Sequence, residues 1–127
     1  MMIKLSILIA SLGGGLAVLL GAFGAHGLRG RIEDRLLETF HTAVEYQMYH
    51  SLALLLVAIL AQQSGKSLAL DVASAAFMLG MLLFSGSLYG LVLTDMKWLG
   101  PITPIGGLCF IVGWMALGCY GFQRFVG

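Results

Sequence analysis

The side chains most able to do chemistry in this sequence are three histidines and the glutamates, tyrosines and glutamine around them. Glu38 and His41 stand three residues apart and Glu45 follows one turn later, so on a helix they share one face. This carboxylate and imidazole spacing occurs in the di-metal sites of helical bundles, which also need a second matching motif and two more carboxylates. The chain has no second motif, although a dimer would bring two copies together. We therefore predict no metal and no other cofactor.

The same residues suggest an alternative, a path for ions or protons. Ionisable groups at membrane depth that face a bundle interior mark such paths, whereas at the interface they only reach toward water or cap a helix. The candidate polar site consists of His26, His41, Glu45, Tyr46, Gln47, Tyr49 and His50. No catalytic Ser/His/Asp arrangement, phosphate-binding glycine loop or Cys-x-x-Cys pair accompanies them. An enzyme is therefore the less favoured class, and we predict no catalytic residues.

Four long stretches without Asp, Glu, Lys or Arg must position these side chains. They cover residues 5–28, 46–65, 72–94 and 98–123, and each is long enough for the roughly 20 apolar residues of a membrane-spanning helix. Of all residues, 59% are hydrophobic and 10% are charged, whereas a soluble domain has about 25% charged residues. The sequence predicts an all-α membrane protein, a single domain over residues 1–127 with four transmembrane helices in an up-down bundle. The predicted spans are about 3–25, 45–63, 70–93 and 101–123.

Between the first and second spans the pattern becomes amphipathic. Apolar residues repeat every four positions from Leu28 to Val44, with six charged residues between them. We predict an interfacial amphipathic helix over about 29–44 that lies on the membrane surface and turns into the second span. The polar residues from Tyr46 to His50 then crowd one end of that span, at the membrane boundary.

Small residues lie at helical spacing in three of the spans. Because lipid tails supply no hydrophobic drive between helices, small residues that let backbones approach are how membrane bundles gain contact. The predicted helix-packing residues are Gly13, Ala17, Gly21, Gly86, Gly90, Gly106 and Gly107. Ser85 and Ser87 are suited to hydrogen bonds across helices. We expect the first and fourth spans to meet through their glycines.

Other features bear on processing, redox state and topology. The first apolar run resembles a cleaved signal peptide but is longer than the usual h-region, which favours a retained span. Cys109 and Cys119 are ten residues apart, about 80° around one helix, so they cannot form a disulfide with each other. An even number of spans puts Lys4, Lys66 and Arg124 on one side and Arg29, Arg31, Arg35 and Lys97 on the other. The positive-inside rule then predicts termini outside the cytoplasm.

Four ordered motifs carry a family resemblance. They are GAFGAHGL at 21–28, TAVEYQMYHSLA at 42–53, FSGSLY at 84–89 and LGPITPIGG at 99–107. The chain resembles the YgdD-like family of small bacterial inner-membrane proteins, which includes eukaryotic transmembrane protein 256, and the motifs cover nearly its whole length. The resemblance implies a multi-pass protein of the bacterial inner membrane. It supplies no catalytic residues, because the family is known mainly as uncharacterised.

These observations lead to one expected function and one alternative. We expect a non-enzymatic integral membrane protein whose partners are membrane lipids and either further copies of itself or another membrane protein. The alternative is a small oligomeric transporter or proton-coupled carrier that uses the polar site. A metal-dependent membrane enzyme is a third possibility. The formal charge of +1 without a basic cluster excludes a nucleic-acid partner.

Overall fold

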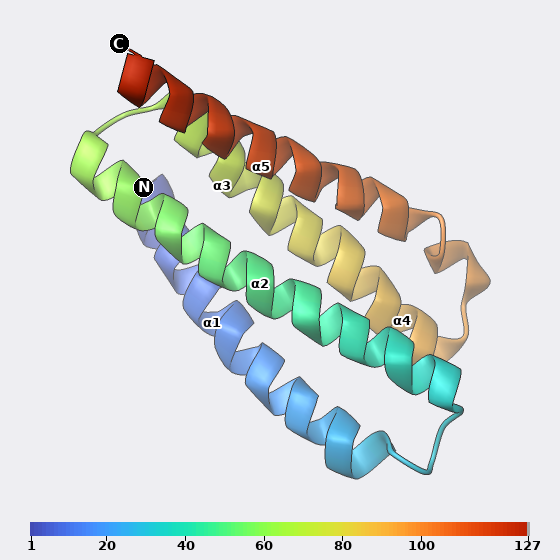
Figure 1. Ribbon diagram of the computed structural model, residues 1–127. Coiled ribbons are helices and arrows are strands. Elements are labelled where there is room, and N and C mark those ends of the chain that lie inside the picture. Colours follow the sequence, from blue (N-terminus) through green and yellow to red (C-terminus); the bar gives the residue numbers. More distant parts are fainter. Residues whose placement is uncertain (127) are drawn as a thin grey trace.

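The computed structural model describes residues 1–126, and these form only helices and short connections (Figure 1). In chain order the elements are α1 (Met2–Phe23), the π-helical turn η1 (Gly24–Leu28), α2 (Asp34–Ser64), α3 (Leu68–Gly80), the π-helical turn η2 (Met81–Ser85), α4 (Gly86–Thr94), the 3-10 turn η3 (Lys97–Leu99) and α5 (Ile102–Val126). The π-helical turns continue the neighbouring helices without a break. The elements therefore combine into four long helical rods.

The four rods confirm the all-α, four-span prediction. Met2–Leu28, Asp34–Ser64, Leu68–Thr94 and Lys97–Val126 are each long and apolar enough to cross a membrane. They run alternately up and down, and both termini lie at the same end of the bundle (Figure 1). Glycines allow two of the turns between the helices, because Gly30 and Gly65 have positive φ, which glycine adopts without strain. The Ser67 hydroxyl caps the start of α3 by accepting a hydrogen bond from the Leu70 amide.

The separate interfacial helix predicted over about 29–44 is wrong. Residues 29–33 form the connection after η1, and α2 then runs unbroken for 31 residues from Asp34. The amphipathic segment is therefore the first part of the second long helix. The sequence offers no glycine or proline near Val44 to end a helix there. The apolar stripe does turn inward. Phe40 is buried against Leu28 and Val92, in a cluster at the end of the bundle that bears η1.

A larger apolar core fills the other part of the bundle. Its fully buried members Leu54, Val57, Leu70 and Phe77 come from α2 and α3, and Phe110 joins them from α5. By contrast, large side chains of α1 and α5 point outward along most of their length. The two outer rods therefore rest on a buried α2 and α3 centre, as expected where lipid rather than water surrounds the outer face.

The expected meeting of the first and fourth spans is also wrong. Figure 1 places α1 and α5 on opposite sides of the bundle; α1 packs along α2, and α5 packs along α3 and η2. Gly106 makes a close contact with the backbone of η2. A Cβ there would press on the backbone nitrogen of Phe84 and lie 2.8 Å from its Cα. The small residues of α5 thus allow close packing against η2 and α3, not against α1.

The other predicted packing residues differ in how close their neighbours come. A Cβ at Gly13 would lie 2.5 Å from Ser51, one at Gly21 would lie 3.4 Å from Val44, and one at Gly90 would lie 2.7 Å from Leu99. Ala17 is 1% exposed. Gly107 is looser, with Phe84 ring atoms at 3.9 Å, and Gly86 has nothing within 4 Å. Gly86 therefore leaves an open space instead of a helix contact.

Candidate functional site

Two polar residues of α2, Gln47 and His50, are buried inside the bundle, whereas Glu45, Tyr46 and Tyr49 are exposed. Because α2 starts at Asp34, Gln47 and His50 are residues 14 and 17 of its 31. Their partners on other helices, Gly13 and Trp114, lie well inside the charge-free stretches 5–28 and 98–123. Gln47 and His50 therefore lie in the middle of a candidate span, where a buried polar group must find its partner within the protein.

His50 is held by two hydrogen bonds in a stack of aromatic rings. Its Nε2 accepts from the Nε1–H of Trp114 at 3.1 Å, and its Nδ1 lies 2.7 Å from the Tyr46 carbonyl oxygen. Indole nitrogen only donates and a carbonyl only accepts, so both bonds require the neutral imidazole with its hydrogen on Nδ1. The Phe110 ring stacks on the imidazole with centroids 3.5 Å apart. His50 thus joins α2 to α5 as a neutral group.

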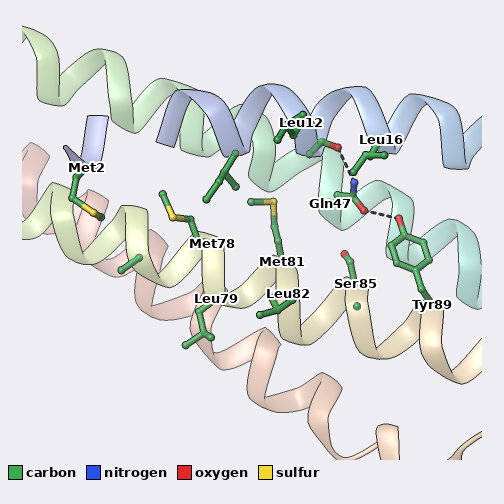
Figure 2. Close-up of a pocket in the computed structure, with 14 residues that line it drawn as sticks. Met2, Leu12, Leu16, Gln47, Met78, Leu79, Met81, Leu82, Ser85 and Tyr89 are labelled. Atoms are coloured by element: carbon green, nitrogen blue, oxygen red, sulfur yellow. Dashed lines mark hydrogen bonds between the residues drawn. The ribbon is translucent and has the colours of Figure 1, made fainter. Parts of the chain in front are cut away.

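Gln47 lies about 60° around α2 from His50 and joins three helices. Its Nε2 donates to the Gly13 carbonyl on α1 at 2.7 Å, and its Oε1 accepts from the Tyr89 hydroxyl on α4 at 2.7 Å (Figure 2). The side chain is 8% exposed. An amide in this position satisfies one group on each neighbouring helix, so it fixes how α1 and α4 sit on α2.

Serines complete the internal hydrogen bonding. Ser85 donates to the Ala43 carbonyl at 2.7 Å, and Ser87 shares a hydrogen bond of 2.6 Å with Thr103. These two serines bond across helices as their sequence suggested. Among the buried side-chain nitrogen and oxygen atoms of residues 1–126, only Ser6 Oγ lacks a partner. Nearly all the deep polar groups are therefore used for holding helices together.

Of the remaining candidate residues, Tyr46 adjoins His50, and the two rings stack with centroids 6.0 Å apart. His41 lies beside Gly24, near the end of the bundle where His26 belongs to η1. Tyr46 stacks on Phe84 at 4.5 Å but is 38% exposed. Within the described chain, no three His, Cys, Asp or Glu side chains gather as a metal site would require. The seven residues divide into separate groups on different faces of α2 and η1.

Glu45 and Tyr49 occupy the outer face of α2. Both are exposed, and they follow Glu38 at helical spacing along that face. In residues 1–126 no basic nitrogen lies within the 4 Å of an ion pair from the Glu45 carboxylate; the one ion pair found joins Arg35 to Glu33. Glu45 is thus a carboxylate of the candidate site that is exposed and has no ion-pair partner among the described residues.

Sequence reasoning missed two partners, Trp114 and Tyr89. Each stands alone in an apolar segment, and a single aromatic residue is normally a packing residue or an interfacial anchor. Their polar atoms were a usable signal, because an indole N–H or a phenol O–H deep in a span must bond something. The sequence alone does not say which residue that is.

An apolar groove opens between α1 and the rod made of α3, η2 and α4 (Figure 2). Its volume is about 740 Å³, and Gln47 and Tyr89 lie at its inner end. The walls come from leucines and methionines such as Leu12, Met78 and Leu82. The groove exists because α1 packs along α2 and only lightly on α3, and because Gly86 presents no side chain.

Comparison with known proteins gives a family and several bacterial relatives. A family described as "Protein of unknown function (DUF423)" matches residues 20–107. A UPF0382 membrane protein of Staphylococcus aureus is 48% identical over 90% of this chain and 92% of its own length. The UPF0382 membrane protein YwdK of Bacillus subtilis is 46% identical over 90% and 93%, and a Staphylococcus haemolyticus relative is 44% identical over 98% and 99%. No solved structure matches the chain.

Proposed function

The chain belongs to the DUF423 family of proteins of unknown function, and from that premise we propose that it is a non-enzymatic protein of the bacterial inner membrane. It acts through helix packing with itself or with a protein or lipid partner, and its termini lie outside the cytoplasm. The deep polar groups support this proposal because they bond one another across helices and leave no reactive cluster.

The single observation that carries the proposal is the exposed carboxylate of Glu45. Measured along α2, Glu45 lies roughly 29 Å from Ser64, so a hydrocarbon layer about 30 Å thick that ends near Ser64 begins close to Glu45. A charge at the bilayer centre costs about 2.5–3.5 kcal/mol on insertion scales, and less toward the interface. A second copy or another membrane protein packed on this face of α2 removes that exposure to lipid.

Cysteine cross-linking tests whether the Glu45 face of α2 meets a second copy. With Cys109 and Cys119 replaced by serine, Tyr49→Cys is expected to give a disulfide-linked dimer for most of the protein in native membranes. The control Val18→Cys lies on the outer face of α1, is 62% exposed and should stay largely monomeric. Native mass spectrometry in native-lipid particles then scores oligomers and co-purifying proteins. A monodisperse monomer without any partner would contradict the proposal.

A second candidate function, a small oligomeric carrier, is favoured by one specific observation. The third span changes to a π-helical turn at η2, which packs against the helix that carries the His50 partner Trp114. Transporters place their sites at irregular helices near the membrane centre. In proteoliposomes, His50→Ala and Glu45→Gln would change solute or proton flux under this function. If both variants show the same flux as the parent protein, the carrier function is contradicted.

A further inference from the structure

The groove between α1 and α3 continues into a polar mouth at the end of the bundle that bears the termini. The mouth has Lys66, Asp71 and Gln62 among its lining residues, and Met2 lines both the mouth and the groove. Helical spacing supports the continuity, since Asp71, Ala75, Met78 and Leu82 follow one another by four, three and four residues on the same face. A polar entrance thus leads into an apolar slot.

We propose that this slot and mouth bind one phospholipid, with an acyl chain in the groove and a zwitterionic aminophospholipid headgroup at the mouth. The inference rests on the proposed function, because it names the lipid that a packing protein of this kind holds. Among its lining side chains, the mouth offers one ammonium, at Lys66, and one carboxylate, at Asp71. These charges complement the phosphate and the amine of such a headgroup, respectively, whereas an anionic headgroup without an amine would leave Asp71 unmatched.

The dimensions of the groove favour an acyl chain over a helix. From Met2 to Leu16 the groove follows α1 for roughly 21 Å, longer than the roughly 15 Å that one leaflet of hydrocarbon occupies. Its volume of about 740 Å³ over that length gives a mean cross-section of roughly 35 Å², or a width of roughly 7 Å. A helix with side chains is about 10–12 Å across and does not fit. A hydrocarbon chain, whose atoms pack at about 3.5–4.0 Å, does.

The lining also suits a flexible chain without polar atoms. Met78 and Met81 are unbranched and polarizable, so they adapt to a chain of varying shape. At the inner end, Gln47 already bonds Gly13 and Tyr89. The groove therefore demands no polar group from the part of the ligand that reaches its end, which is the property of an acyl terminus.

A photoactivatable lipid tests the proposal on the full chain. The protein is reconstituted with phosphatidylethanolamine that carries a diazirine on its acyl chain, and labelled residues are mapped by mass spectrometry. Labelling is expected to concentrate on the lining residues of α1, α3 and η2. Gly86→Leu fills the groove and should reduce this labelling at least fivefold, whereas the control Gly118→Leu, on α5 with no neighbours within 4 Å, should leave it within twofold.

Competition identifies the headgroup, and cross-linking separates this inference from the proposed function. Unlabelled phosphatidylethanolamine should displace the probe at least threefold better than phosphatidylglycerol, and the Asp71→Asn variant should lose that preference. Equal labelling of the Gly86→Leu and Gly118→Leu variants, or equal competition by the two lipids, would overturn the inference. If the Tyr49→Cys dimer persists in that case, the proposed function stands. If lipid labelling persists but no dimer or protein partner is found, the result contradicts the proposed packing of a partner on the Glu45 face of α2 and leaves the lipid site standing.

Discussion

Replacing Gly106 by alanine is expected to lower the free energy of unfolding by about 2–3 kcal/mol. The added methyl group would press on the backbone nitrogen and Cα of Phe84, and backbone atoms cannot rotate away as a side-chain end can. Inserting one carbon into a well-packed contact generally costs about 1–3 kcal/mol, and a clash with backbone belongs at the upper end of that range. The change would push α5 away from η2. Reversible unfolding in mixed micelles, followed by circular dichroism, measures the loss.

Gly107→Ala is the matched control for Gly106→Ala. It is the next residue on the same helix and makes the same chemical change, but its added methyl group would have its nearest neighbour at 3.9 Å, in ordinary contact. Its expected effect on the free energy of unfolding is under about 0.5 kcal/mol, and a small gain is equally compatible because alanine favours helix over glycine. Equal stability of the two variants would show that the Gly106 contact is not tight.

The pair formed by His50 and Trp114 is expected to be non-additive. His50→Leu leaves the Trp114 N–H without an acceptor, and Trp114→Phe leaves His50 Nε2 without a donor. An orphaned polar group in a buried place costs about 1–3 kcal/mol, whereas removing both partners avoids that cost. We expect the double variant to be more stable than the sum of the two single losses by about 1 kcal/mol, within the range found for hydrogen bonds between membrane helices.

The same unfolding assay in micelles gives the four free energies of this double-mutant cycle. A coupling indistinguishable from zero would mean that the bond between Trp114 and His50 does not contribute to stability. His50→Leu also removes the stacking on Phe110, but this loss is the same with either residue at position 114 and cancels from the coupling. The coupling therefore measures the direct interaction between His50 and Trp114, which consists of the hydrogen bond and their edge-on ring contact.

The sequence predicts the number and approximate extent of the spans because the cost of charges in hydrocarbon makes their limits visible. It does not predict that α2 is continuous. The charged residues between Asp34 and Glu45 look like those of a surface helix, and only the burial of Leu37, Phe40 and Ala43 in the bundle shows that they belong to the second span. An amphipathic period is the same whether the apolar stripe meets lipid or other helices.

The candidate site was predicted less well, for a related reason. Its residue types were found, but Gln47, His50 and Glu45 stand within six positions of one another and point to three different surroundings. Neighbours in sequence diverge by about 100° per residue on a helix, so a polar cluster in the sequence need not be a cluster in space. The partners Gly13, Tyr89 and Trp114 come from three other helices, whose order around α2 no local pattern specifies.

The π-helical turn η2 divides the third span into two helical parts, α3 and α4, whose side chains are rotated relative to each other about the helix axis. A π-helical turn contains more residues than an α-helical turn. Every residue after Ser85 is therefore rotated about the helix axis relative to a regular continuation of α3. Ser87 therefore faces Thr103 and Tyr89 faces Gln47 only while the residue count between Met81 and Ser85 is kept. One deleted residue here would turn the whole of α4 by about 100° and leave α3 in register. The number of residues in η2 therefore sets the rotation of α4 relative to α3. We expect a change in this number to disturb the packing of α4 more than a substitution within the segment.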